Sequence, residues 1–193
     1  MNQASMLARQ SWRAGRWQRG SYTLVAGFVA IFALGLIAHL TNRPYMFPSL
    51  GPTAIGLFFL PLAKDACPRN VIVGHGIGAL CGYGALWVTG LAYAPATFEV
   101  GVSQSRVVAA ALALALTGAV MIWLQREHLP AGATTLIVAL GIMPSATDVA
   151  ILMAGVVVIT YLALAINRLV GIPYPFWGPL PPKMRDTPAG PRR

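Results

Sequence analysis

The stretch VAILMAGVVVITYLALAI, residues 149–166, runs for about five helical turns without a charged residue. A helix of about 20 apolar residues spans the roughly 30 Å hydrocarbon core of a bilayer. Three further stretches of this kind occupy residues 22–40, 71–87 and 107–124. Together they predict an all-α polytopic membrane protein, with the lipid bilayer as its first partner.

The charged residues of the chain are concentrated near its two ends. Of the 193 residues, 56% are hydrophobic and 10% are charged, yet the net charge is +9. Residues 22–167 contribute only +1 to this value. A charge at the bilayer centre costs about 2.5–3.5 kcal/mol, so an uncharged middle with basic ends is typical of a membrane protein. The composition excludes disorder and most soluble enzymes, and it gives little support to a nucleic-acid partner.

Two shorter apolar segments, residues 48–61 and 130–144, are each bounded by prolines. Proline suits the start of a helix and opposes its continuation, so each segment is expected to form a short helix. Both are short for a lipid-exposed span. They are interpreted either as short buried spans or as re-entrant half-helices.

The positive-inside rule favours six crossings over four. With six crossings and an inner N-terminus, the inner loops carry Lys64, Arg69 and Arg126. With four crossings and two re-entrant segments, Arg43, Lys64 and Arg69 would all face outward. Both arrangements place the two termini in the cytoplasm, and the expected location is a bacterial inner membrane.

The order long span, short segment, long span occurs twice, and matching residues lie 81 positions apart. Gly51-Pro52-Thr53 in the first half corresponds to Gly132-Ala133-Thr134 in the second. With three crossings per half, the second copy must be inverted in the membrane. The alternative is that apolar helices, which use few residue types, align by chance.

The chain divides into three parts. Residues 1–20 are expected to form a basic interfacial segment, residues 21–168 the transmembrane domain, and residues 169–193 a Pro-rich cytoplasmic tail. Three aromatic residues are expected to anchor the start of this tail at the membrane surface: Tyr174, Phe176 and Trp177.

The starts of the two short helices are the predicted anion site. A helix N-terminus presents unpaired N–H groups and about half a positive charge, and small residues let an ion approach the backbone. The predicted site residues at these starts are Ser49, Gly51, Thr53, Gly132, Thr134 and Thr135. The alternative is ordinary N-capping of short helices.

Three basic residues near span ends are expected to attract the anion from the cytoplasmic face: Arg69, His75 and His128. They could form a basic vestibule or a proton-sensitive gate. The plainer interpretations are a positive-inside anchor for Arg69 and local hydrogen bonding at helix ends for the two histidines.

No motif of an enzyme, cofactor site or metal site is recognisable. The sequence lacks HExxH, GxSxG, a Walker loop and CxxC, and we predict no catalytic residues, cofactor or bound metal. Gly74, Gly78 and Gly82 are spaced four residues apart, which places them on one helix face and predicts close helix packing rather than pore lining.

Three segments resemble the HPP family of small integral membrane proteins. They are FPSLGPTA at residues 47–54, PRNVIVGH at 68–75 and HLPAGATTL at 128–136. The His-Pro-Pro motif of the family is replaced by His128-Leu129-Pro130, which leaves the following Gly-Ala-Thr intact. Members of the family are associated with nitrite transport in chloroplasts and cyanobacteria.

The resemblance implies a transporter or channel for a small monovalent inorganic anion, with nitrite as the named candidate. The alternative is a structural or assembly subunit of a larger membrane complex, which the glycine stripe and the aromatic tail would suit. In either case we expect a homo-oligomer or partners in a membrane complex, which would shield the short segments.

Overall fold

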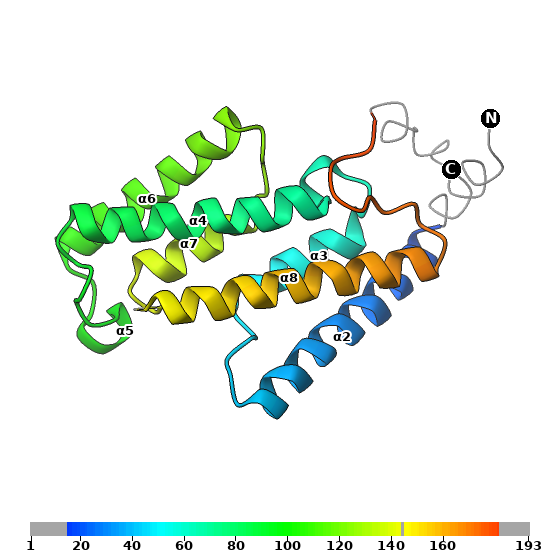
Figure 1. Cartoon of the computed structure of the whole chain (residues 1–193), viewed down its shortest axis with the longest axis horizontal. Coiled ribbons are helices and arrows are strands. Elements are labelled where there is room, and N and C mark those ends of the chain that lie inside the picture. Colours follow the sequence, from blue (N-terminus) through cyan, green and yellow to red (C-terminus); the bar gives the residue numbers. More distant parts are fainter. Residues whose placement is uncertain (1–14, 144, 182–193) are drawn as a thin grey trace.

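The structure, a computed structural model, describes residues 15–143 and 145–181, and all regular structure in this part of the chain is helical. The elements are α2 (Arg16–Thr41), α3 (Leu50–Phe59), the 3-10 turn η1 (Lys64–Ala66), α4 (Pro68–Val88), α5 (Thr97–Val100), α6 (Gln104–Trp123), α7 (Ala131–Ala139) and α8 (Ala146–Leu169). The all-α prediction is therefore confirmed for the described residues (Figure 1).

Four of these helices, α2, α4, α6 and α8, are long and apolar enough to cross a membrane. They match the four long spans that the sequence predicts, with Leu124 one residue beyond the end of α6. The single-turn helix α5 was not predicted. The outer parts of the predicted basic segment and Pro-rich tail, residues 1–14 and 182–193, lie outside the described residues.

Short polar residues fix where the long helices begin. The Ser145 hydroxyl accepts a hydrogen bond from the Asp148 backbone N–H, and the Asp148 carboxylate accepts one from the Ser145 N–H. This capping box satisfies two N–H groups at the start of α8. Ser103 caps α6 in a similar way, and Pro68 occupies the first position of α4, where a missing N–H costs nothing.

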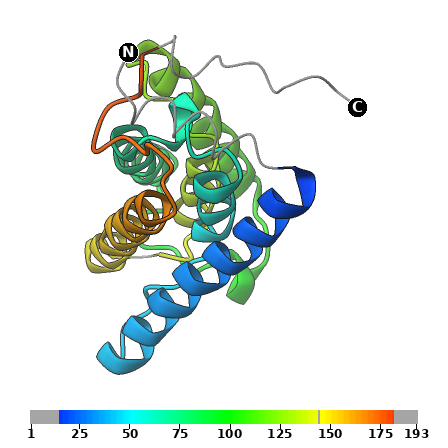
Figure 2. The same cartoon turned by 90° about the vertical axis from the view of Figure 1, so that its right-hand side faces the viewer.

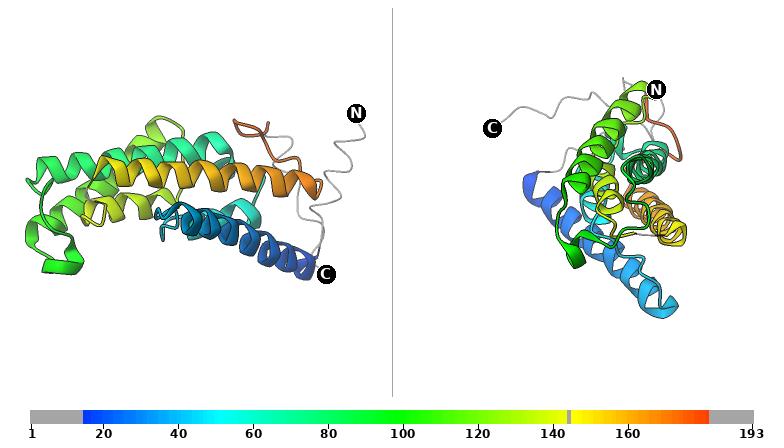
Figure 3. Two further views of the ribbon diagram at one scale, coloured as in Figure 1. Left: turned by 60° about the horizontal axis from the view of Figure 1, so that its bottom comes forward. Right: turned by 90° about the vertical axis from the view of Figure 1, so that its left-hand side faces the viewer.

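Helices α4 and α8 run in opposite directions through the middle of the molecule, and α2 and α6 lie at opposite corners (Figures 1 and 3). Helix α4 packs against α6, α7 and α8, whereas α2 packs against α3 and α8. The Thr41 half of α2 diverges from the other helices (Figures 1 and 2). We call the end where α2 begins and α8 ends the tail end, and the opposite end the α5 end.

The two short helices begin near the middle of the molecule and run to opposite ends (Figure 1). Helix α3 runs to the tail end and α7 to the α5 end. Each follows a long helix that ends beside a left-handed residue, Asn42 after α2 and Gln125 after α6, both with φ of 55°. The chain then returns to the middle without helical structure at residues 44–47 and 126–128.

The glycine stripe of α4 is a packing surface, as the sequence predicts. A methyl group on Gly78 would lie 2.7 Å from the carbonyl oxygen of Ala131, and one on Gly82 would lie 2.8 Å from Val138 Cβ. Carbon atoms do not approach other heavy atoms so closely, so α7 occupies the space that side chains would need. The stripe thereby brings the start of α7 against the middle of α4.

Two glycines at equivalent positions of the two halves, Gly74 and Gly155, pack closely in the same way. A methyl group on Gly74 of α4 would lie 2.7 Å from His128 Cβ, in the connection that leads into α7. A methyl group on Gly155 of α8 would lie 2.9 Å from the carbonyl oxygen of Tyr45, in the connection that leads into α3. These two glycines lie 81 residues apart, as Gly51 and Gly132 do.

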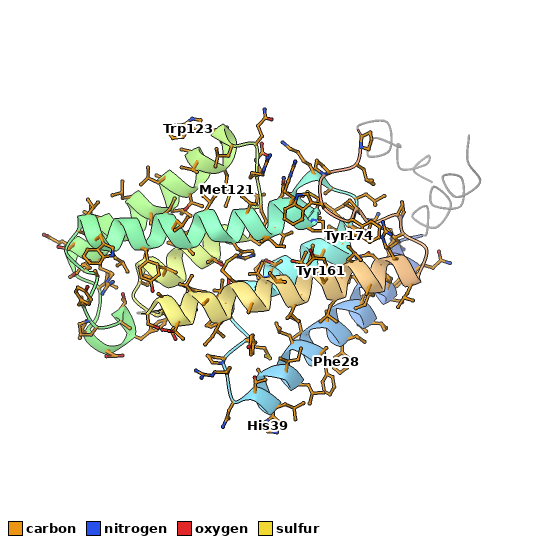
Figure 4. The ribbon with its side chains drawn as sticks, in the orientation of Figure 1. Phe28, His39, Met121, Trp123, Tyr161 and Tyr174 are labelled. Carbon is orange, nitrogen blue, oxygen red and sulfur yellow. The ribbon has the colours of Figure 1, made fainter. Side chains whose placement is uncertain are left out.

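The segment after α8 folds back onto the tail end rather than leaving the molecule at once. Tyr174 is fully buried, and its hydroxyl donates a hydrogen bond to the Ala66 carbonyl (Figure 4). The Arg69 backbone N–H donates to Trp177 O, and the Arg168 guanidinium stacks 3.5 Å from the Phe176 ring. The predicted surface role is therefore wrong for Tyr174, which packs in the protein core. We call residues 172–178 the strap.

Candidate functional site

His75 connects the two short helices at the centre of the molecule. Its side chain leaves α4 near the start of α7 and is fully buried. Nδ1 lies 2.7 Å from Thr134 Oγ1 on α7, and Nε2 lies 2.9 Å from Thr53 Oγ1 on α3. One imidazole is thus hydrogen-bonded on both sides, to residues that the sequence places at equivalent positions of the two halves.

His128, in the connection before α7, extends this hydrogen-bonded group toward the tail end. Its Nδ1 lies 2.8 Å from the backbone carbonyl of Asp65 in η1. Its Nε2 lies 3.4 Å from Thr53 Oγ1, and its ring centroid is 5.0 Å from that of His75. Because a carbonyl oxygen can only accept, Nδ1 of His128 must carry the hydrogen, and Nε2 is an acceptor in the neutral ring.

The fixed hydrogen on His128 orders the remaining protons. The acceptor Nε2 can receive the Thr53 hydroxyl hydrogen, and the Thr53 oxygen can then accept from Nε2–H of His75. In that state Nδ1 of His75 is an acceptor and receives the hydroxyl of Thr134. When Thr53 donates to His128, a single direction of donation runs from Thr134 to the Asp65 carbonyl. Thr53 has one competing acceptor, the Ser49 carbonyl at 3.1 Å.

Ser49 adds an unused polar group beside this chain of hydrogen bonds. It is fully buried immediately before α3, in helical backbone geometry, and its hydroxyl caps no helix N–H. Its Oγ has no hydrogen-bond partner among the described residues. Buried polar groups are nearly always hydrogen-bonded, because an unmade bond costs about 1–3 kcal/mol. A free, buried hydroxyl at this position is what a ligand site would present.

The backbone of the two helix starts differs from the prediction. The sequence analysis expected unpaired N–H groups there, but the first ones are satisfied by the preceding turns. Gly51 N–H donates to Pro48 O and Gly132 N–H donates to Leu129 O. These short i to i−3 bonds close the helix starts, so side chains rather than backbone N–H groups face the centre.

Five of the nine predicted site residues gather at the centre: Ser49, Thr53, His75, His128 and Thr134. The two glycines are placed differently. Gly51 has open space where a side chain would be, and at Gly132 that position faces Leu114 of α6. Their small size therefore does not serve a central site in this structure.

Thr135 and Arg69 also lie apart from the five. Thr135 Oγ1 is 2.9 Å from Thr117 Oγ1 of α6 and donates to its own helix at Ala131 O. Arg69 has its guanidinium close to Gly178 of the strap, and its backbone N–H is bound there as well. The predicted meeting of Arg69 with the histidines does not occur.

An ion pair lies near the cluster at the tail end. Lys64 Nζ lies 2.8 Å from Glu127 Oε2, and the bond to this ammonium lowers the pKa of the Glu127 carboxyl. Asn70, fully buried in α4, donates to Glu127 O, while its Oδ1 has no partner within the described part of the chain. Burial raises the pKa of the neighbouring Cys67 thiol, which favours its uncharged form. Polar groups thus reach from the surface to His128.

Sequence reasoning missed two buried polar residues that the structure makes prominent. Asn70 is one, and Arg106 of α6 is the other, with only 2% of its surface exposed. Arg106 donates to the carbonyls of Ala139 at 3.2 Å and Pro95 at 2.7 Å, which ties the end of α7 to the α5 end. A cation is favoured at a helix C-terminus. The sequence did contain a signal for Arg106, because it is the one charged residue within the otherwise uncharged helix α6.

Comparisons with known proteins agree with this membrane architecture. The family model of the HPP transmembrane region matches residues 13–175, so the chain belongs to the HPP transmembrane family. A curated transmembrane protein of Dictyostelium discoideum is 32% identical over 125 residues, which is 63% of this chain and 40% of that relative. The chain therefore spans less than half of the relative's length. No solved structure matches the chain.

Proposed function

We propose that this member of the HPP transmembrane family is a transporter or channel for a small monovalent anion such as nitrite. The observation that carries the proposal is the buried group at the centre, where Thr53 and Thr134 hold His75 between two short helices. Beside it lies the free hydroxyl of Ser49. These groups are hydrogen-bond donors without a fixed negative charge, which suits an anion of a few atoms.

The electrostatics of the surrounding helices support an anion rather than a cation. Helices α3 and α7 contain no ionisable residue, and both direct their N-terminal ends toward the centre (Figure 1). The partial positive charge of a helix N-terminus favours a negative ligand even where its N–H groups are already bonded. A metal ion has less support. Within the described ranges, no three His, Cys, Asp or Glu side chains gather to bind one.

We further propose that the chain crosses the membrane six times in two inverted halves. The short helices run to opposite ends, and two pairs of helix bounds lie 81 residues apart: α3 and α7 begin at Leu50 and Ala131, and α4 and α8 end at Val88 and Leu169. Inverted repeats with interrupted helices that meet at mid-membrane are a common plan of transporters. Under this plan each short helix and the connection before it form one crossing.

The distribution of charge favours a cytoplasmic tail end in a bacterial inner membrane. The described helix ends and connections at the tail end carry six basic residues and two acidic ones: Arg16, Arg19, Lys64, Arg69, Arg126 and Arg168 against Asp65 and Glu127. The connections at the other ends of the four long helices are balanced: Arg43 and Arg106 against Glu99 and Asp148. Basic residues mark the cytoplasmic side of a membrane protein.

Anion flux into vesicles tests the transport proposal. The purified protein is reconstituted, and uptake of nitrite, nitrate, formate and chloride is compared with uptake by protein-free vesicles. We expect uptake of at least one of these anions to exceed the background about tenfold or more, and Thr134→Val to reduce it. If none of the four enters faster than in protein-free vesicles, the proposal is wrong.

A structural or assembly subunit is the second candidate, and one surface favours it. An apolar groove of about 440 Å³ lies on the diverging half of α2, lined by Phe28, Ile31, Phe32, Gly35, Leu36, His39 and Met46. Phe28 projects away from the other helices (Figure 4). Lipid or another membrane helix would fill this groove. Stable co-purification with a larger complex, together with no anion flux, would favour this role.

A further inference from the structure

We propose that the anion site takes up one proton with each anion, through His75 and His128, so that the two are carried together. This inference rests on the proposed anion transport and specifies its coupling. Its basis is the hydrogen bonding of the cluster, in which His128 donates from Nδ1 and Thr53 lies between Nε2 of His128 and Nε2 of His75.

Two ring nitrogens of the neutral cluster carry no hydrogen. They are Nε2 of His128 and Nδ1 of His75, and each has a threonine hydroxyl within reach, at 3.4 Å and 2.7 Å. When a proton binds to either nitrogen, that ring becomes a donor on both sides. The adjacent threonine must then accept, and its own hydroxyl hydrogen is released to bind something else.

A released hydroxyl becomes available to a new acceptor beside the buried Ser49. Protonation of His75 releases the Thr134 hydroxyl for an anion. The Thr53 hydroxyl that protonation of His128 releases has the Ser49 carbonyl at 3.1 Å as an alternative acceptor. The Ser49 hydroxyl is unpartnered in the same place. The proton therefore adds positive charge and hydrogen-bond donors at once, and both changes strengthen anion binding.

The reverse effect holds as well, because linkage between two ligands is reciprocal. An imidazolium in an apolar interior is costly unless a negative charge pairs with it. The cluster contacts Asp65 only through its backbone carbonyl. No carboxylate side chain is hydrogen-bonded to either histidine within residues 15–143 and 145–181, and the Asp65 carboxylate acts on His128 only through space. The bound anion is therefore the counter-charge that contacts the rings directly. Proton and anion bind together, and the loaded site is neutral.

The ionisable groups around the cluster do not replace this counter-charge. Helices α3 and α7 contribute none. On the other elements packed around the cluster the groups are Lys64, Asp65, Cys67, Arg69, Cys81, Tyr83, Arg106, Arg126, Glu127, Asp148, Tyr161, Arg168 and Tyr174. Of the three carboxylates, Glu127 is paired with Lys64 and Asp148 caps α8 at the α5 end. Asp65 binds His128 through its backbone carbonyl, and its carboxylate is hydrogen-bonded to neither ring.

The two central histidines have no histidine at the equivalent position of the other half. Subtracting 81 places Phe47 at the position of His128, and adding 81 places Val156 at that of His75. Matching positions of the two halves thus carry histidine in one and an apolar residue in the other. Glu127, which precedes His128 in the chain, pairs with Lys64 at the tail end, so we expect the proton to enter from there.

The coupling is tested by counting protons per anion. The purified full-length protein is titrated calorimetrically with nitrite in two buffers of different ionisation enthalpy, and we expect uptake of about one proton per bound anion. In vesicles with a pH dye inside, nitrite entry is expected to acidify the lumen beyond protein-free vesicles and to be unaffected by a valinomycin-clamped potential.

Variants separate coupling from folding. His128→Gln and His75→Gln remove the titrating ring, and we expect the proton count to fall from about one to near zero. His39→Gln, exposed at the end of α2, is the matched control and keeps it. A second readout is thermal unfolding, which identifies a variant that fails to fold. If a histidine variant fails to fold, the number of protons that the wild-type protein takes up per bound anion alone tests the coupling.

The two proposals fail in different ways. Nitrite flux that follows the membrane potential, with no proton taken up on binding, overturns the coupling and leaves anion transport standing. Proton-linked binding without any flux supports the coupled site and overturns transport. Absence of both binding and flux overturns both proposals.

Discussion

Thr53 and Thr134, which lie 81 residues apart, are hydrogen-bonded to opposite nitrogens of one imidazole, that of His75. The two Oγ1 atoms lie 2.9 Å and 2.7 Å from Nε2 and Nδ1. The contact ties the starts of both short helices to α4. Removal of either hydroxyl therefore affects both halves of the molecule.

Thr53→Val and Thr134→Val are each expected to reduce anion flux about tenfold or more. Valine has the shape of threonine but lacks its hydroxyl, so one nitrogen of the buried His75 loses its partner. The matched control is Thr160→Val, because the equally buried Thr160 bonds only to its own helix at Val156 O. Flux of the Thr160 variant should stay within twofold of wild type. Equal losses in all three would contradict a specific role for the cluster.

Gly78→Ala is expected to destabilise the protein by about 1–3 kcal/mol, because its methyl group would meet the Ala131 carbonyl at 2.7 Å. Gly84→Ala on the same helix meets nothing within 4 Å, and should be neutral or stabilising by up to about 1 kcal/mol through helix propensity. Thermal unfolding in one detergent compares the two. Similar shifts in the melting temperature would argue against close packing of α7 on the glycine stripe.

Arg106→Met is expected to cost about 2–4 kcal/mol, since it leaves the buried carbonyls of Ala139 and Pro95 without their donor. Arg106→Lys should recover part of that loss, because an ammonium reaches fewer acceptors than a guanidinium. Arg43→Ala, at an exposed arginine, serves as the control and should change stability by less than about 0.5 kcal/mol. If Arg106→Met is as stable as wild type, the guanidinium does not hold the end of α7.

Cysteine labelling in intact cells distinguishes six crossings from four. In a Cys67→Ala, Cys81→Ala background, six crossings predict that a cysteine replacing Arg43 reacts with an impermeant maleimide added outside. A cysteine replacing Lys64 should react only after the cells are opened. Re-entry of the segment between these positions would place both on the same side, and both cysteines would then react from outside.

The ion pair of Lys64 and Glu127 should affect acid stability only weakly. The pKa of Glu127 is lowered in the folded state, so the pair stabilises the protein above the usual glutamate range and is lost as the pH falls through the lowered pKa. Both side chains are about 40% exposed, so solvent screens the pair. Glu127→Gln is expected to shift stability at neutral pH by less than about 1 kcal/mol. A larger loss would show that the carboxylate supports the neighbouring His128.

The long helices could be predicted from sequence because burial in lipid leaves a strong signal. An uninterrupted run such as residues 149–166 has few alternatives. The extended connections before α3 and α7 were harder, because the left-handed turn at Gln125 uses a residue with no marked preference for it. Burial of Tyr174 was also missed, because an aromatic residue between prolines is equally typical of a membrane surface and of a protein core.

The candidate site was predictable in its side chains but not in its backbone. Spacing of 81 residues pointed to Thr53 and Thr134 together, and the structure brings both to His75. The sequence could not reveal that preceding turns occupy the first N–H groups of the short helices, because such bonds depend on local geometry. Arg69 was misplaced because six residues along a helix turn its side chain away from His75.

Through two hydrogen bonds, the strap is connected to the central histidine His128. Tyr174 holds the Ala66 carbonyl, and the adjoining Asp65 carbonyl holds His128. A pull on residues after Tyr174 would therefore reach His128 through a single turn of backbone. A fluorescent reporter fused directly after Tyr174 would therefore disturb the position of His128.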